Sequence, residues 1–119
     1  MKTLLIIEDN EVNLYLTRFL LEKCGYRVLE AKDGVTGVAM AVEHKPDLVL
    51  MDIQLPDIDG LEATSRIRAN AEAGTLPIVA LTSYAMTGDR ERALAAGCTG
   101  YIEKPINPET FVAELEKYF

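Results

Sequence analysis

Short apolar runs alternate along the chain with longer segments that show the 3.6-residue periodicity of amphipathic helices. The runs are apolar at successive positions, which indicates strands covered on both faces, and turn-forming or charged residues follow each of them. The runs cover residues 3–7, 27–31, 48–52, 76–81 and 98–102, and the helical segments cover residues 11–24, 35–44, 61–69, 89–96 and 107–119. Five strands alternating with five helices predict an α/β fold, a doubly wound parallel sheet with helices on both faces.

The helical segments differ in which residues they are expected to bury. In segment 11–24, the arc expected to face the sheet contains Leu14, Thr17, Leu20, Leu21 and Cys24. A second arc, with Val12, Tyr15 and Phe19 and with Leu16 at its boundary, would then be partly exposed. Such residues are either ordinary surface apolar side chains or a partner-binding surface, and both interpretations stay open.

For segment 35–44 the periodicity predicts an inner stripe of Val35, Val38, Ala39 and Val42, and segment 61–69 is expected to carry Arg66 and Arg68 outward. Residues 85–88 are a poor helix start, so the fourth helix is placed at 89–96. Asn107 and Pro108 fit the N-cap and first position of the last helix, which is expected to bury Phe111, Val112 and Leu115. Segment 27–31 is the most polar run and is expected at a sheet edge.

Composition is that of one globular domain. The chain has 119 residues, of which 49% are hydrophobic and 26% charged, and a net charge of −7, which argues against nucleic acid as a direct ligand. No apolar run reaches the length of a membrane span, and the first strand begins too close to Met1 to leave room for a signal peptide, so a cytoplasmic protein without a membrane association is expected. Cys24 and Cys98 lack a CxxC spacing and are expected to be buried thiols.

Residues whose side chains can react or bind a metal follow the strands. Glu8 and Asp9 follow the first run, Asp52 ends the third, Thr82 follows the fourth, and Lys104 comes just after the fifth. The carboxyl ends of parallel strands line one crevice, and neighbouring strands lie about 5 Å apart. If the first and third strands are neighbours, three carboxylates crowd one space, and a hard divalent cation such as Mg²⁺ would relieve their repulsion. A single Asp after a strand is often only a turn former, but three acids facing a lysine and a hydroxyl are poorly explained by turns.

This set of residues favours phosphoryl transfer. Asp52 is a candidate nucleophile, the metal and Lys104 would neutralise charge on the transferring group, and Thr82 can donate a hydrogen bond to it. No His or Cys stands at the other strand ends, so hydrolysis by a Ser/His/Asp or Cys/His arrangement lacks its parts. Neither a GxGxxG nor a Walker A loop is present.

Four segments at strand ends together resemble the response-regulator receiver domain of two-component signalling, over essentially the whole chain. Each segment is weakly specific alone, but their order and their positions at strand ends make the set highly specific. The segments are Ile7-Glu8-Asp9-Asn10, Met51-Asp52-Ile53-Gln54-Leu55-Pro56 with Asp59-Gly60, Leu81-Thr82-Ser83, and Tyr101-Ile102-Glu103-Lys104-Pro105. The resemblance implies a flavodoxin-like fold with strand order 2-1-3-4-5.

The resemblance also implies a role for the acidic residues. Asp52 would accept a phosphoryl group from a phosphohistidine of a histidine kinase or a histidine phosphotransfer protein. Asp9, Asp52 and the backbone carbonyl of Gln54 would hold Mg²⁺, for which Mn²⁺ can substitute, and Glu8 would act through a water. The chain would be a signalling switch, an enzyme only in its own phosphorylation and dephosphorylation.

The remaining motif residues would read the phosphorylated state. Lys104 would pair with the phosphoryl group, with a cis peptide bond to Pro105, and Thr82 would turn toward it while Tyr101 moves inward. Phosphorylation adds charge and acceptor oxygens and would change contacts with a downstream protein through the face of helix four, strand five and helix five. Residues 1–119 are expected to form a single receiver domain without an output module, as a monomer or weak dimer.

Two other functions are compatible with parts of the pattern. An Mg²⁺-dependent small-molecule phosphatase with an aspartyl-phosphate intermediate would need a second acid two residues after the nucleophile, where this chain has Gln54. The chain also leaves little sequence for a substrate cap. A purely structural binding module would leave the acidic cluster unexplained.

Overall fold

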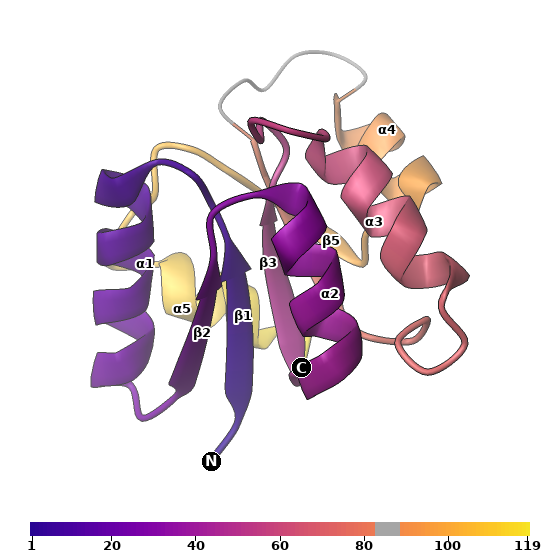
Figure 1. The fold of residues 1–119 in the computed structure, drawn as a ribbon. Coiled ribbons are helices and arrows are strands. Elements are labelled where there is room, and N and C mark those ends of the chain that lie inside the picture. The colour runs from indigo at the N-terminus through magenta and orange to yellow at the C-terminus, as the bar shows by residue number, and fades with distance from the viewer. Residues whose placement is uncertain (83–88) are drawn as a thin grey trace.

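The computed structural model describes residues 1–82 and 89–119, and it confirms the predicted fold class. The five strands form one parallel sheet in the order β2-β1-β3-β4-β5, as Figure 1 shows for the arrangement of the elements. The strands are β1 (Thr3–Ile7), β2 (Arg27–Ala31), β3 (Leu48–Asp52), β4 (Ile78–Thr82) and β5 (Gly100–Glu103). The helices are α1 (Glu11–Lys23), α2 (Gly34–His44), α3 (Gly60–Ala69), α4 (Asp89–Ala96) and α5 (Phe111–Glu116).

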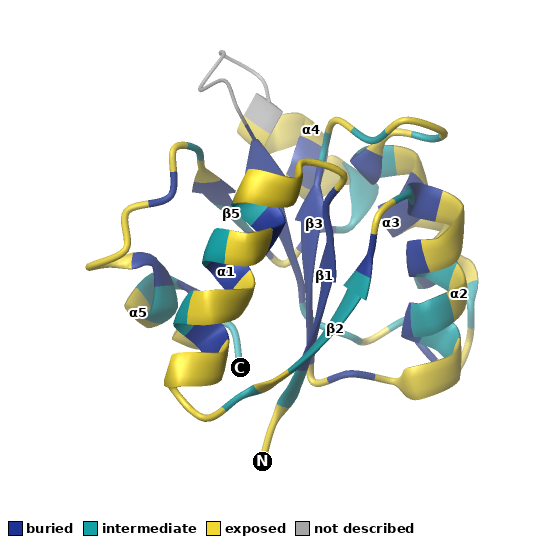
Figure 2. Ribbon diagram, turned by 60° about the vertical axis from the view of Figure 1, so that its left-hand side comes forward, coloured by how far each residue is buried: buried dark blue, intermediate teal, exposed yellow. Residues whose placement is uncertain are grey.

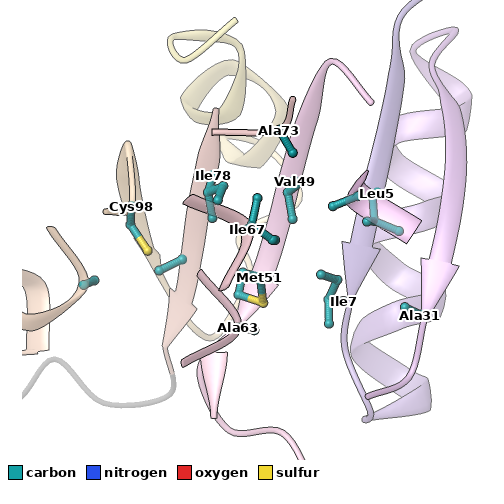
Figure 3. Close-up of a cluster of buried hydrophobic side chains, with 13 residues drawn as sticks. Leu5, Ile7, Ala31, Val49, Met51, Ala63, Ile67, Ala73, Ile78 and Cys98 are labelled. Atoms are coloured by element: carbon teal, nitrogen blue, oxygen red, sulfur yellow. The ribbon is translucent and has the colours of Figure 1, made fainter. Parts of the chain in front are cut away.

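The sheet is buried on both faces, as the continuous apolar runs predict. Along β1, Leu5 and Ile7 pack in a core with residues of α2, α3 and α4, and this cluster is drawn in Figure 3. Leu4 and Ile6 point to the opposite face, into a core with residues of α1 and α5. Every residue of β3 and β4 is buried, whereas β2 at the edge is mostly intermediate, as the colours of Figure 2 show.

Helix α1 turns the predicted arc toward the core, with Leu20 half-buried and the last position exposed. Leu14, Thr17 and Leu21 are buried, but Cys24 is exposed, so the expectation of two buried thiols is wrong for Cys24. The helix ends at Lys23, and Gly25 at φ 91° turns the chain toward β2, so Cys24 lies beyond the last turn that covers the sheet. Cys98 is buried as predicted.

Helix α2 packs through only part of the predicted stripe, since Val38 and Val42 contact the core and the other two residues do not. Val35 and Ala39 are exposed, and the buried positions are instead Gly34, Gly37 and Ala41. A Cβ atom on Gly37 would lie 2.5 Å from Cδ1 of Ile7. The helix therefore approaches the sheet through positions without bulky side chains, a contact that a search for apolar residues misses.

Arg68 of α3 also differs from its prediction, whereas Arg66 is exposed as expected. The Arg68 guanidinium turns back and donates hydrogen bonds to the carbonyl oxygens of Gly97 and Gly74, at 2.8 and 3.1 Å. It also donates to the carbonyl oxygen of Leu76. The side chain thus joins the end of α3 to the loops before β4 and β5, where several backbone carbonyls lack a strand partner.

The fourth helix begins where it was predicted, and the fifth begins later than predicted. Helix α4 begins at Asp89 as predicted, while Ser83 and the expected poor helix start at 85–88 lie outside the described residues. Helix α5 begins at Phe111, not at Pro108. The carbonyl of Asn107 accepts a hydrogen bond from the Thr110 N–H at 3.1 Å, so a separate turn precedes the regular helix. None of the described helices is both long enough and apolar enough to cross a bilayer.

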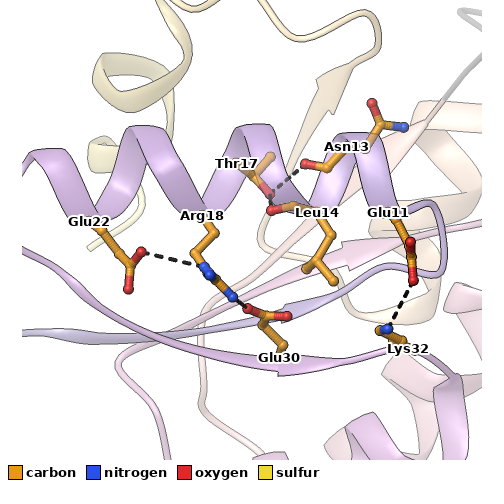
Figure 4. A network of polar contacts seen from close by, with 8 residues as sticks. All are labelled: Glu11, Asn13, Leu14, Thr17, Arg18, Glu22, Glu30 and Lys32. Carbon is orange, nitrogen blue, oxygen red and sulfur yellow. Dashed lines mark hydrogen bonds and ion pairs between the residues drawn. The ribbon is translucent and has the colours of Figure 1, made fainter.

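Polar contacts attach α1 to the edge strand and its exit. Figure 4 shows Arg18 between Glu22, at 3.4 Å, and Glu30 of β2, and Lys32 beside Glu11 at 3.2 Å. These side chains are largely exposed, so each pair contributes little to stability. Beside this charged row, the exposed side of α1 also carries the apolar residues Val12, Tyr15 and Phe19.

Candidate metal centre

The sheet register brings the predicted acidic residues together. Ile7 of β1 lies opposite Met51 of β3, so Glu8 and Asp52 are the next positions on two neighbouring strands. Glu8 is fully buried and Asp52 is 2% exposed, whereas Asp9 is exposed. One carboxylate oxygen from each of Glu8, Asp9 and Asp52 lies within 4.8 Å of the others. The three acids thus form one cluster that opens to solvent at Asp9.

Lys104 enters this cluster from the opposite side. The Lys104 backbone N–H donates to the carbonyl of Thr82 at 2.7 Å, which extends the pairing of β4 with β5 by one residue. The peptide bond from Lys104 to Pro105 is cis, as the motif implies. The ammonium nitrogen lies 3.0 Å from Oε1 of Glu8 and 3.3 Å from Oδ1 of Asp52. Lys104 is therefore shared between two buried carboxylates.

Three carboxylates of the cluster lie close to one another, and Lys104 is paired with two of them. The pKa of Glu8 is raised to about 7, mainly by burial and also by the neighbouring Asp52 carboxylate, while Lys104 acts in the opposite direction. Oε1 of Glu8 is buried and makes no well-directed hydrogen bond among the described residues, although it is paired with Lys104. Carboxylate oxygens are ligands that Mg²⁺ prefers, and Glu8, Asp9 and Asp52 each offer one here, so the donor set fits this ion.

The loop after β3 is held against the site by backbone contacts. The Gln54 N–H donates to Oδ1 of Asp52 at 3.2 Å, and the Gly60 N–H donates to the Ile53 carbonyl at 2.8 Å. A Cβ atom on Gly60 would lie 2.3 Å from the carbonyl oxygen of Asp52, so only glycine allows this approach. Gln54 thus lies beside Asp52, and its predicted role as a carbonyl ligand stays a prediction.

Thr82 and Tyr101 lie on adjacent strands near the cluster. Thr82 ends β4 and is 4% exposed, and Tyr101 is a half-buried residue of β5. Both line a small cavity of about 20 Å³, together with Ile53, Leu61 and side chains of α4. The two residues that were predicted to act as a switch therefore share one space between the acidic cluster and α4.

The exposed apolar residues of α1 lie on the helix that follows the acidic pair. Val12, Tyr15 and Phe19 are 76%, 68% and 51% exposed, and Leu16 is half-buried. The Tyr15 and Phe19 rings are stacked with centroids 6.3 Å apart. Asn10 caps the helix, accepting a hydrogen bond from the Asn13 N–H at 3.0 Å. The predicted exposure of this arc is confirmed, and its use by a partner stays a prediction.

Sequence reasoning missed two features around the site. The pairing of Glu8 with Lys104 joins residues that follow β1 and β5, with β3 and β4 between them, and a linear motif carries no signal for such a contact. No role was predicted for Asp57, yet its carboxylate accepts hydrogen bonds from the backbone of α2. The sequence did offer one indication of this contact. Asp57 is an acid in a loop that follows a strand, and the second helix begins at the same edge of the sheet.

Comparison with known proteins places this site in a family. Residues 4–116 match the family described as the response regulator receiver domain. The chain is 43% identical to the polar-differentiation response regulator DivK of Brucella anthropi, over 98% of this chain and 95% of that protein.

Solved structures give the same result. The receiver domain of a sensor histidine kinase from Pseudomonas aeruginosa, whose structure has a magnesium ion coordinated in the active site cleft, is 38% identical with a TM-score of 0.91, over 98% of this chain and 96% of that one. The chemotaxis protein CheY4 of Vibrio cholerae has a TM-score of 0.94 at 28% identity, over 100% and 99%. The fold, the order of the four motifs and these similarities agree, and the chain belongs to the response-regulator receiver domains of two-component signalling.

Proposed function

We propose that this receiver domain accepts a phosphoryl group onto Asp52 from a phosphohistidine of a histidine kinase or histidine phosphotransfer protein, in a reaction that depends on Mg²⁺. The observation that carries the proposal is the position of Asp52, a buried carboxylate at the end of β3 that lies 3.3 Å from Lys104 and within a cluster of three acids. A carboxylate in this setting serves as a nucleophile in aspartyl-phosphate chemistry.

The transfer step uses groups that the structure brings together. A carboxylate oxygen of Asp52 forms a bond to phosphorus, the bond from phosphorus to the donor's imidazole nitrogen breaks, and that nitrogen keeps the electron pair. Lys104 lies on the same side as Oδ1 of Asp52 and can neutralise charge on the phosphoryl oxygens. The Thr82 hydroxyl can donate a hydrogen bond to one of those oxygens once it turns toward them.

Four groups of this chain would hold the metal. Asp9 and Asp52 would ligate it directly, the Gln54 carbonyl would supply a neutral oxygen, and Glu8 would act through a water. When bound, Mg²⁺ or Mn²⁺ supplies positive charge that offsets the negative charge of the acids and the phosphoryl group. The burial of Glu8 and the gathering of three carboxylates beside the ammonium group of Lys104 support this assignment.

In the proposed response to phosphorylation, β5 links the site to the surface that a downstream protein would contact. Tyr101 shares a small cavity with Thr82 on one side and on the other lines a groove of about 880 Å³ between α4 and α5. A move of Thr82 toward the phosphoryl group would enlarge the cavity, and the Tyr101 ring could then turn inward. The face of α4, β5 and α5 would change shape for a downstream protein.

The proposed input surface is the exposed arc of α1, formed by Val12, Tyr15, Leu16 and Phe19. An apolar patch of stacked aromatic rings beside the acidic cluster suits contact with an apolar helical surface that presents the phosphohistidine. Charge contacts of Arg18 and Lys32 fix the neighbouring face of the same helix.

The test is incubation of the purified chain with Mg²⁺ and acetyl phosphate, followed by intact-mass measurement. We expect the mass of one phosphoryl group to be added to the wild type and not to Asp52→Asn. Omission of Mg²⁺ should suppress the modification. Phosphorylation that persists in Asp52→Asn, or its absence from the wild type even with a phosphohistidine donor, would contradict the proposal.

A further inference from the structure

The N-terminus of α2 is capped by two carboxylates, one of which comes from a distant loop. Asp33, the residue before the helix, accepts a hydrogen bond from the Thr36 N–H at 2.7 Å, as an N-cap residue does. Asp57, in the loop between β3 and α3, accepts the N–H groups of Gly34 and Val35 at 2.8 Å each. The first N–H groups of a helix have no partner within the helix, so Asp57 satisfies two of them from outside.

This contact is electrostatically strong for an exposed side chain. Hydrogen bonds from backbone N–H groups lower the pKa of Asp57 to about 2, that of Val35 most and those of Gly34, Ile58 and Asp57 less, while desolvation opposes them. The carboxylate therefore stays ionised at neutral pH, where it also interacts favourably with the positive end of the helix dipole. The two bonds are charge-assisted and fix both oxygens, so they restrict the orientation of the Asp57 side chain and its backbone.

Packing reinforces the contact at both ends of the loop. Next to Asp57, Ile58 covers Gly34 so closely that a Cβ atom there would lie 2.4 Å from Cγ1 of Ile58. At the base of the loop, Gly60 lies against the backbone of Asp52 and donates its N–H to Ile53. Residues 53–59 are thus held at the sheet by Gly60 and at α2 by Asp57.

The same loop carries a group that the proposed metal site uses. Gln54 lies three residues before Asp57, and its N–H donates to Oδ1 of Asp52 at 3.2 Å. We propose that Asp57 is a positioning residue for the metal centre, because it ties the loop to α2 and so holds the Gln54 backbone beside Asp52. This inference rests on the proposed function, in which the Gln54 carbonyl is a metal ligand.

Three variants separate this role from a general effect on α2. Asp57→Ala removes both hydrogen bonds, and Asp57→Asn retains one acceptor oxygen. Asp33→Ala is the matched control, because it removes a cap from the same helix without touching the loop. Mg²⁺ alone is titrated into each purified protein, and the dissociation constant is measured from backbone amide shifts in NMR spectra.

We expect Asp57→Ala to weaken Mg²⁺ binding by on the order of tenfold, at the lower end of the range for groups that orient metal ligands. Asp57→Asn should lie between it and the wild type. Asp33→Ala should lower the unfolding temperature and leave the dissociation constant unchanged. In the metal-free proteins, amide exchange at Gln54 should accelerate in Asp57→Ala and not in Asp33→Ala.

Each alternative result of these measurements would contradict one specific part of the proposal. Equal Mg²⁺ affinities of Asp57→Ala and the wild type would refute the positioning role and leave the proposed function standing. An equal loss of affinity in Asp33→Ala would mean that Asp57 acts only through the stability of α2. Failure of the wild type to bind Mg²⁺ would refute the metal site itself.

Discussion

The ammonium nitrogen of Lys104 lies 3.0 Å from Oε1 of Glu8, and both side chains are almost withdrawn from water. The lysine is thereby held between Glu8 and Asp52 before any phosphoryl group arrives. A transferring group would compete with Glu8 for the same ammonium group. The pair therefore combines a structural contact of the resting state with a cation already placed for the phosphorylated one.

Replacement of this lysine should destabilise the resting protein. Lys104→Met leaves the buried Glu8 without its cation, and we expect a loss of about 1 to 3 kcal/mol in unfolding free energy without Mg²⁺. Urea denaturation followed by circular dichroism measures it. Lys32→Met, which removes an exposed ion pair with Glu11, is the control and should change stability by less than about 0.5 kcal/mol. Equal losses of unfolding free energy in the two variants would show that the buried ion pair stabilises the protein no more than an exposed one.

Asp57 should give the protein a specific response to acid. Its folded pKa of about 2 lies below the ordinary value of 3.8, so the unfolded chain binds more protons between these values. The stabilisation is complete above about pH 4 and is lost as the pH falls through about 2. We expect Asp57→Asn to be less stable than the wild type near neutral pH, with a difference that disappears toward about pH 2.

Urea midpoints measured at several pH values between about 2 and 7 test this dependence. Because Asp57 is exposed, salt should also reduce the difference between the two proteins. A difference that stays constant down to the lowest pH would assign the effect to packing of the loop and not to the charge of Asp57.

The close approach of α2 to the sheet predicts an unfavourable response to an added methyl group. Alanine favours a helix over glycine by about 1 kcal/mol, but a Cβ atom at Gly37 would overlap the buried Ile7 side chain. We expect Gly37→Ala to destabilise the protein by about 1 to 3 kcal/mol, the usual cost of overpacking. Thermal unfolding measures it.

Ala39→Gly gives the matched measure of helix propensity, since Ala39 is exposed on the same helix. Ala39→Gly should lower the unfolding free energy by about 1 kcal/mol. If Gly37→Ala instead raises the stability by a similar amount, the Ile7 side chain yields and the contact does not limit the approach of α2.

The exposed arc of α1 should affect phosphoryl transfer from a protein donor only. Phe19→Glu places a charge where an apolar contact is proposed, so transfer from a cognate phosphotransfer protein should slow by about tenfold or more, equivalent to about 1.4 kcal/mol of lost contact. Labelling by acetyl phosphate should be unchanged, because that donor needs no such surface. Rapid-quench kinetics with both donors measure the two rates.

Ala39→Glu on α2 is the control for added charge at an exposed helical position. It should leave both rates unchanged. An unfolded Phe19→Glu protein would mean that the arc contributes to the core, and an unchanged rate with the protein donor would remove α1 from the proposed input surface.

Much of the fold follows from periodicity because the runs that form β1, β3 and β4 are almost uniformly apolar. Runs such as residues 3–7 and 48–52 coincide with β1 and β3, and the charged residues after them identify the edge of the sheet that bears the site. Parallel pairing then brings Glu8 and Asp52 together once β1 and β3 are neighbours, an order that the family resemblance implied. The site was predictable because its residues lie at positions that the topology itself makes neighbours.

The misjudged features depend on contacts between distant residues. Val35 fits an apolar stripe, but the glycines of α2 determine which face meets Ile7. Arg68 looks like a solvent-facing charge until the carbonyl groups of Gly74 and Gly97 are placed beside it. Helix propensity and hydrophobicity describe one residue at a time, so close approach and long-range hydrogen bonding escape them.

The charged surface of β2 has a consequence for association between molecules. A strand at the edge of a sheet exposes unpaired backbone groups onto which a strand of another molecule could add. Here Arg27 is exposed on β2, and Glu30 is held in place by Arg18 of α1. A second molecule would have to dehydrate these charges to extend the sheet. The ion pair that fastens α1 to β2 thus also opposes edge-to-edge aggregation.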